Sequence, residues 1–233
     1  MAEAIGNAIR DRGFLLKSVP YGDHHRILNF LTENHGKVGL IAFSARNSRR
    51  RFSGALDFLH CLELEFKQQP RGALSQLLLC SLAKDCEWNG RDYDIHIFAM
   101  EWLRLLSQCL HDGQHVAGVF DLLRDSLKVL GSGDPFPLDV TFRINLLSKL
   151  GYHLNFDACL QCGGCEGGRY GFAAERGGIL CEGCVTLEER FRFEGPLPSS
   201  SNIDNERHLQ VRKVLDFAFE SYLGIAIDRK DYF

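Results

Sequence analysis

Apolar and polar residues alternate through much of the first eighty residues, which is the pattern of β-strands that are buried on one face. Glycine, proline and asparagine residues separate the alternating runs as turns do. The pattern predicts five strands, at residues 13–19, 26–32, 38–43, 60–66 and 74–82. Residues 34–37 are expected to join the second and third strands as a hairpin. Five short strands with one irregular basic connection favour a small barrel of the OB type. A generic five-stranded sandwich is the alternative.

From about residue 92 the apolar residues recur every three or four positions, as they do on one face of a helix. This spacing predicts helices over residues 95–109, 116–130, 142–150 and 206–222. Residues 134–137, with the sequence Asp-Pro-Phe-Pro, are expected to form a loop, and residues 195–198 to begin a linker. The change of period therefore predicts an α+β protein in which a barrel precedes helices.

Two cysteine pairs interrupt the helical part, Cys159-x2-Cys162 and Cys181-x2-Cys184, with 18 residues between them. The spacing is typical of a zinc knuckle, in which two tight turns offer four thiolates to one tetrahedral ion. Four sulfur ligands leave no open coordination position, so the expected Zn²⁺ is structural rather than catalytic. Two disulfides or four unbound thiols are the alternatives. Cys165 is expected to be a spectator, although its spacing would let it replace one of the ligands.

Together these patterns predict the fold class and a domain division. The fold class is α+β, with an N-terminal five-stranded OB-type β-barrel followed by an α-helical domain that carries a four-cysteine zinc knuckle. We expect the barrel domain to span residues 1–82 and the helical domain residues 83–233. The zinc-binding segment is expected at about residues 155–188.

Charge is distributed unevenly along the chain. Residues 1–80 hold 11 basic and 7 acidic residues, whereas the remainder holds 16 basic and 23 acidic residues, for a net charge of −3. The basic part therefore suits contact with a polyanion. The connection after the third predicted strand concentrates this charge in four arginines: Arg46, Arg49, Arg50 and Arg51. Guanidinium groups bind phosphates bidentately and displace counterions, so this loop predicts sequence-independent nucleic-acid binding.

Neighbouring residues are expected to extend this site. Arg26 and Lys37 would support the arginines, and Lys17 would enlarge the basic patch. Phe43 and Phe52 flank the loop and could stack on bases, although phenylalanines in such positions more often pack in a core. A solvated basic loop that pairs with the acidic part of the chain is the alternative.

Known catalytic motifs are missing from the sequence: it contains neither a P-loop nor a G-x-S-x-G elbow. Asp23-His24-His25 offers acid–base groups, but neighbouring side chains on a strand point to opposite faces. We therefore expect no enzymatic activity and no small-molecule substrate. The first residues do not resemble a signal peptide, and no apolar run approaches the ~20 residues that cross a membrane. A cytoplasmic protein without membrane contact is expected.

Several segments resemble the RecO family of DNA repair proteins, in the same order along the chain. The N-terminal motifs are Leu16-x4-Tyr21-Gly22-Asp23-x2-Arg26-Ile27, Leu31-Thr32-Glu33-x2-Gly36-Lys37, and Ala45-Arg46 with Ser48 and the three arginines that follow. The C-terminal motifs are Phe142-Arg143-x2-Leu146-Leu147-x2-Leu150-Gly151-Tyr152, Cys159-x2-Cys162-Gly163, Phe172, Gly177-Gly178 and Cys181-x2-Cys184. The chain departs from the family pattern in two places: Ser44 replaces the glycine that usually precedes Ala-Arg, and Cys165 is additional.

The resemblance implies an N-terminal OB barrel, a helical C-terminal domain with an inserted structural zinc site, and a recombination mediator that acts in gap and break repair. Members bind single- and double-stranded DNA and anneal complementary strands. They act with RecR, and often with RecF, to load RecA onto DNA coated by the single-stranded DNA-binding protein SSB, whose acidic-hydrophobic C-terminal tail they contact. The implied location is the cytoplasm, in association with the bacterial nucleoid.

Three other functions fit parts of the sequence. A zinc-ribbon adaptor of transcription or translation would use the barrel to bind RNA. A nuclease would use an acidic cluster with magnesium. A protein-binding scaffold would have no affinity for DNA even at low salt.

Overall fold

The computed structural model describes residues 8–45, 51–52, 56–69, 74–84, 88, 90, 92–131, 133–164, 168–186, 192–194 and 205–227. The chain divides into two compact units, residues 1–132 and residues 133–233. The expected boundary at residue 82 coincides with the end of the last barrel strand, whereas the compact units divide fifty residues later. The barrel domain of residues 1–82 and the helical domain of residues 83–233 stay predictions.

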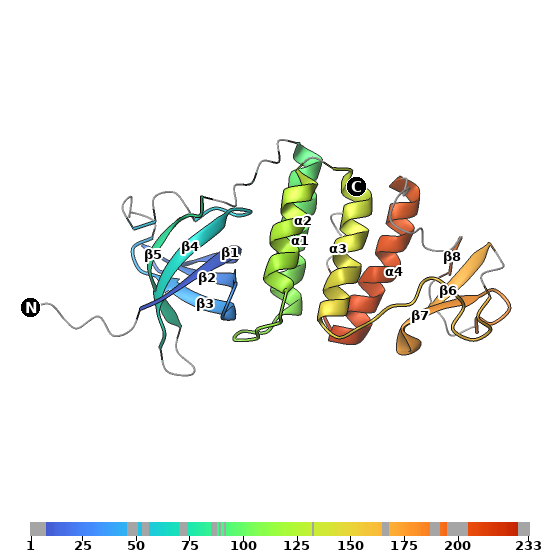
Figure 1. Cartoon of the computed structure of the whole chain (residues 1–233). Helices are drawn as coiled ribbons and strands as arrows, with labels where there is room; N and C mark the ends of the chain where they lie inside the picture. The colour runs from blue at the N-terminus through green and yellow to red at the C-terminus, as the bar shows by residue number, and fades with distance from the viewer. Residues whose placement is uncertain are drawn as a thin grey trace, which may run out of the picture. The chain divides into compact units, whose positions relative to one another are not determined.

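The first unit begins with a closed five-stranded barrel (Figure 1). Its strands are β1 (Ala8–Tyr21), β2 (His25–Thr32), β3 (Gly36–Ala42), β4 (Cys61–Lys67) and β5 (Ser75–Leu82). Their order is β1–β2–β3–β5–β4, and β3 pairs with β5 in parallel while the other neighbours are antiparallel. The OB-type barrel is confirmed. β1 begins five residues earlier than predicted, because residues 8–14 pair with β4, a partner that lies about fifty residues away.

Alternate positions of the strands fill the barrel interior. These residues are almost completely buried: Leu15, Leu28, Phe30, Leu40, Ala42, Phe52, Leu62, Leu64, Phe66, Leu77 and Cys80. Phe52 therefore packs in the core and cannot stack on a base, which removes one of the two aromatic residues that the sequence analysis considered for that role. Burial in this core also raises the pKa of the Cys80 thiol to about 12.

Two helices, α1 (Tyr93–Cys109) and α2 (Val119–Leu130), complete the first unit. α2 starts three residues later than predicted, after Gly118, whose φ of 76° does not continue a helix. The helices pack on the outside of the barrel, where the ring of Phe14 lies 5.3 Å from that of Phe120. Gly36 marks the closest approach: its φ is 68°, and a Cβ atom there would lie 2.1 Å from the carbonyl oxygen of Gln114. Only glycine fits this contact between barrel and helices.

The second unit contains α3 (Pro135–Lys149) and α4 (Asn205–Leu223), which lie side by side (Figure 1). The predicted loop at residues 134–137 is wrong, because these residues start α3. The Asp134 side chain accepts a hydrogen bond from the backbone N–H of Phe136, and Pro135 occupies the first turn, where a missing N–H costs nothing. The predicted linker at residues 195–198 lies outside the part that the structure describes.

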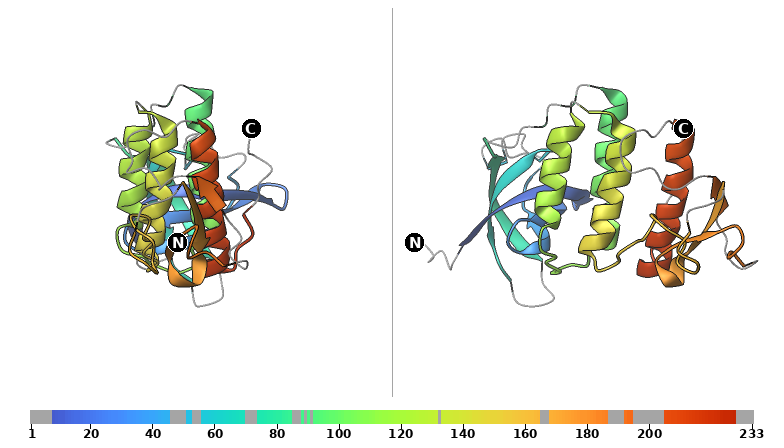
Figure 2. Two further views of the ribbon diagram at one scale, coloured as in Figure 1. Left: turned by 90° about the vertical axis from the view of Figure 1, so that its right-hand side faces the viewer. Right: turned by 45° about the vertical axis from the view of Figure 1, so that its right-hand side comes forward.

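Three short strands form a second sheet in this unit, in the order β7–β6–β8. They are β6 (Arg169–Ala173), β7 (Gly178–Cys181) and β8 (Arg192–Glu194), and the 3-10 turn η1 (Ala174–Arg176) connects β6 to β7. Figure 2 shows this sheet in orange near α4, which η1 contacts. These strands were not predicted from the sequence, where the segment was expected to form only turns around the cysteines. Among the described residues, no helix combines the length and the apolar character needed to cross a membrane.

Candidate nucleic-acid interface and metal centre

Two tight turns bring together the four predicted zinc ligands. In the first turn the N–H of Gly163 donates to the carbonyl oxygen of Cys159, and in the second the N–H of Cys184 donates to that of Cys181, each at 2.9 Å. A bond of the same length from Leu160 N–H to Ile179 C=O ties the first turn to β7. The four sulfur atoms lie within 4.8 Å of one another.

The spacing of the sulfur atoms fits a tetrahedral ion. Zn–S bonds of about 2.3 Å place two sulfur ligands about 3.8 Å apart, and Cys162 Sγ lies 3.7 Å from Cys181 Sγ. All four thiols are free of disulfides, so the two-disulfide alternative is not adopted. The cluster is compatible with zinc and could hold a metal ion. Cys165 is not among the described residues.

The environment of the sulfurs favours one thiolate before any ion binds. Burial alone would raise the pKa of the Cys159 thiol, but backbone hydrogen bonds from Cys162, Cys181 and Gln161 lower it to about 6. The nearby thiols, Cys181 first among them, raise the pKa of Cys184 to about 12. A divalent cation would favour loss of the proton from every one of these thiols, because its charge stabilises all four thiolates together.

The structure describes one of the four arginines in the basic loop, since Arg46, Arg49 and Arg50 fall in an undescribed segment. The carbonyl oxygen of Arg51 accepts a hydrogen bond from the N–H of Cys80 on β5, at 3.1 Å. Its guanidinium donates to the carbonyl oxygen of Phe43 at 2.7 Å and lies 5.2 Å from the ring of Phe52. The last arginine of the loop is therefore held against the barrel wall, between the end of β3 and β5.

The two supporting basic residues have different surroundings. Arg26 is half-buried on β2 and donates to the hydroxyl of Ser18 at 3.1 Å. Lys37 is 7% exposed, and its ammonium donates to the carbonyl oxygens of Ser107 and Leu110, at 2.7 and 2.8 Å. These carbonyls end α1, where a cation also meets the negative end of the helix dipole. Lys37 thus joins the barrel to α1, and this placement argues against a contact with DNA.

Replacing Lys37 by methionine tests whether this residue stabilises the contact between the barrel and α1 or binds DNA. We expect the variant to lose about 1–3 kcal/mol of unfolding free energy, because one buried and one partly buried carbonyl lose a charged donor while the aliphatic contacts are kept. DNA affinity and its salt dependence should not change. Thermal unfolding and DNA titration at several salt concentrations would check both. A flatter salt dependence in a stably folded variant would restore Lys37 to the DNA site.

His25 has a structural task at the start of the basic loop. Its Nδ1 accepts a hydrogen bond from the N–H of Ser44 at 2.9 Å, and its ring meets that of Phe43 edge-on. Ser44 has a φ of 56°, in the left-handed region that favours glycine. A glycine, which the resemblance to the family leads one to expect at this place, would adopt this conformation without strain, and the hydrogen bond that Ser44 donates to His25 stabilises it around a serine.

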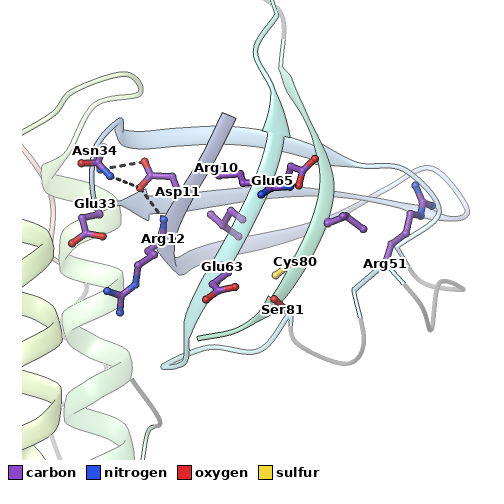
Figure 3. Close-up of a pocket in the computed structure, with 12 residues that line it drawn as sticks. Arg10, Asp11, Arg12, Glu33, Asn34, Arg51, Glu63, Glu65, Cys80 and Ser81 are labelled. Carbon is purple, nitrogen blue, oxygen red and sulfur yellow. Dashed lines mark hydrogen bonds and ion pairs between the residues drawn. The ribbon is translucent and has the colours of Figure 1, made fainter. Parts of the chain in front are cut away.

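A pocket of about 560 Å³ opens on the outside of β1, β4 and β5 (Figure 3). Its charged lining is mixed. Arg10 pairs with Glu65 at 3.1 Å, and Asp11 accepts hydrogen bonds from Asn34. Figure 3 shows Arg51 at the far end from Arg12 and Glu33. Arg10 and Arg12 were not among the predicted site residues, because the first strand was predicted to begin at residue 13 and β1 begins at Ala8. Three charged residues in a row give no apolar alternation, so the pattern held no indication that they continue the strand.

Comparison with known proteins assigns the family. The family model for "Recombination protein O N terminal" matches residues 7–85, and that for "Recombination protein O C terminal" matches residues 90–192. The DNA repair protein RecO of Anaeromyxobacter sp. (strain K) is 33% identical over 74% of this chain and 69% of its own length. The DNA repair protein RecO of Myxococcus xanthus (strain DK1622) is 30% identical over 75% of this chain and 71% of its own length. The DNA repair protein RecO of Bacillus pumilus (strain SAFR-032) is 23% identical over 96% of this chain and 93% of its own length. The chain belongs to the RecO family of DNA repair and recombination proteins.

Proposed function

We propose that this protein is a recombination mediator. It binds single- and double-stranded DNA, anneals complementary strands and, with RecR and in some settings RecF, helps load RecA onto single-stranded DNA coated by SSB. The observation that carries the proposal is the closed OB-type barrel with Arg51 held on its wall, at the end of a loop that contains four arginines. Family membership supports the role in repair.

Annealing follows from charge. Two DNA strands repel each other, so a cationic surface that binds each strand weakly lowers the cost of bringing them together. Base pairing then supplies the sequence match, and the protein need not read bases. We assign the phosphate contacts to Arg46, Arg49, Arg50 and Arg51, with support from Arg26. Lys37 is left out, because its ammonium is engaged by the end of α1.

Replacing Arg46, Arg49, Arg50 and Arg51 together by alanine tests this assignment. We expect DNA affinity to fall at least tenfold at 0.1 M salt, for any sequence. The slope of log affinity against log salt concentration should fall by up to about 3–4, since each lost phosphate contact removes about 0.7–0.9. Replacing the same residues by lysine is the matched control, and it should keep most of the slope. A quadruple alanine variant with an unchanged salt slope would refute the assignment.

For the four cysteines we propose one structural Zn²⁺, held by Cys159, Cys162, Cys181 and Cys184. When bound, the ion would crosslink the two turns and leave no coordination position for a substrate. DNA contacts would remain with the barrel, which uses none of these residues.

The proposed partners are RecR, RecF and the C-terminal tail of SSB. Annealing of two complementary strands, each coated with SSB, tests the mediator role directly. We expect the protein to accelerate annealing, and the acceleration to disappear when SSB lacks its tail. Intact DNA binding without acceleration on coated strands would contradict it. Tighter binding of a matched RNA strand would favour an RNA-binding adaptor instead.

We further propose that the protein acts without enzymatic activity, in the cytoplasm at the nucleoid. We also propose two domains: a barrel domain of residues 1–82 that binds DNA, and a helical domain of residues 83–233 that carries the zinc site. Incubation of pure protein with labelled DNA and magnesium tests the absence of enzymatic activity. Cleavage of the DNA, abolished by a chelator, would contradict it.

A further inference from the structure

The outer face of β1, β2 and β3 carries a patch of apolar side chains. Leu28, Leu40 and Ala42 point into the barrel core, so the positions between them point outward. The strand registers align the outward residues in pairs: Lys17 with Asn29, Val19 with Ile27, Tyr21 with His25, and Ile27 with Ile41. The ring of Phe43 continues this row, with its centre 5.2 Å from that of His25.

Helices cover one end of this face and leave the other end exposed. Near the covered end, Phe14 packs on α2, and Lys37 binds the end of α1. Toward the hairpin between β1 and β2, Tyr21 is 52% exposed, Val19 41% and Phe43 40%. Leu74, also 41% exposed, extends over Gly39 on the same face, since a Cβ atom at Gly39 would lie 3.1 Å from it. We call Val19, Tyr21, Phe43 and Leu74 the outer patch.

The outer patch holds half of the exposed large apolar side chains among the described residues. Such a concentration on a small barrel usually marks a binding surface. Its basic surroundings indicate what binds. Lys17 is exposed on the same face, and the guanidinium of Arg51 donates to the backbone of Phe43 itself. In the sequence, Phe43 is followed directly by the loop with the other three arginines.

We propose that the outer patch stacks the bases of single-stranded DNA. Tyr21 and Phe43 offer aromatic surfaces to successive bases, Val19 and Leu74 exclude water around them, and Lys17 and Arg51 meet the adjoining phosphates. Aromatic stacking tolerates any sequence, because every base has a π-face. The inference rests on the proposed DNA binding and deepens it, by assigning contacts to the bases in addition to those with phosphates.

Stacking would give annealing a direction. An unpaired strand can lay its bases on Tyr21, whereas the bases of a duplex are stacked inside the double helix and cannot reach the ring. Once two strands have paired, the product keeps only phosphate contacts and is bound less tightly than the separate strands. The protein therefore releases the duplex and remains available for further unpaired DNA.

Three labelled probes of equal length separate base contacts from phosphate contacts: a thymidine strand, an abasic strand with the same phosphates, and a duplex. We expect the full-length protein to bind the thymidine strand more tightly than the abasic strand. Tyr21→Ala should lower affinity for the thymidine strand about 5- to 100-fold. Affinity for the abasic strand and the duplex, and the salt slope for all three, should stay unchanged.

Control variants make the outcome specific. Tyr21→Phe keeps the ring and should bind as the wild type does, and Phe43→Ala should repeat the effect of Tyr21→Ala. Tyr93→Ala removes a tyrosine that is 73% exposed on α1, outside the outer patch, and should change nothing. If the wild type binds DNA but Tyr21→Ala has no effect, or lowers the affinity for all three probes equally, stacking is refuted and the DNA-binding proposal survives. A wild-type protein that binds none of the probes refutes both.

Discussion

Serine in place of Cys159 is expected to abolish the proposed zinc binding of the second unit and to unfold its three-stranded sheet. Cys159 is 2% exposed and packs with Ala173 and Leu180 in a small apolar cluster around the turns. A sheet of three strands of three to five residues buries too little apolar surface to be stable alone. A structural zinc ion contributes on the order of 10 kcal/mol to such sites, so its loss outweighs what the cluster retains.

Metal analysis and limited proteolysis check this prediction. The wild type, purified without chelator, should contain one zinc per chain, and Cys159→Ser well under one. Proteolysis of the variant should begin within residues 155–188 while the barrel stays intact and binds DNA. Cys80→Ala is the matched control, because Cys80 is also buried but lies in the barrel core, and it should keep its zinc. Wild-type protein without stoichiometric zinc would contradict the assignment of the metal.

Methionine in place of Arg143 will destabilise the second unit by about 3–5 kcal/mol. Arg143 is buried on α3 and donates to the carboxylates of Asp139, at 2.9 Å, and Asp216 on α4, at 2.8 Å. Asp139 is also 2.9 Å from Nε2 of His208 on α4. Both carboxylates are 0% exposed, so water cannot replace the guanidinium when it is removed.

Chemical denaturation of the full chain, followed by a probe in the second unit, measures the loss. Lys213→Ala, an exposed site on the same α4, is the control and should stay within about 0.5 kcal/mol of the wild type. Combining Arg143→Met with Asp216→Leu should cost less than the sum of the two single changes, because the second change removes a charge that the first left without its guanidinium. Additive costs would show that the ion pairs do not hold α3 against α4.

The ion pairs around Arg143 also determine how the stability of the second unit depends on pH. Burial alone would raise the pKa of the Asp139 carboxyl, but Arg143, His208 and Arg212 together hold it well below its usual range. A carboxyl whose pKa is lower in the folded state contributes stability above its unfolded pKa and loses it as the pH falls below that value. The second unit should therefore lose stability in acid, and Asp139→Asn should remove this part of the dependence.

Regular local patterns predicted most elements of the fold. Alternation located the five barrel strands, and helical spacing located α1, α2 and α4, because each pattern reflects one buried face of a single element. The cysteine spacing predicted which four sulfurs would meet, since each pair lies within one tight turn. Family-specific motifs led to the family that the comparisons confirm.

Predictions were wrong where a residue's surroundings come from distant segments. The start of α3 was read as a loop, since two prolines outweighed the cap that Asp134 provides. Strands β6–β8 are short, and their pairing rather than their pattern defines them. The Lys37 site assignment stays a prediction, but nothing in the sequence beside its glycine turn indicated that its ammonium would bind carbonyls seventy residues away.

The sequence by itself determined the order of the barrel strands and the helices along the chain, the four cysteines that cluster and the basic character of the loop, because these depend on residues close together in the chain. Only the tertiary structure decided which cations remain accessible and which aromatic side chains are exposed. Arg51 lies on the barrel surface and Lys37 beneath a helix, while Phe43 is exposed and Phe52 is buried. Burial depends on what packs against a side chain, and here the packing partners come from elsewhere in the chain.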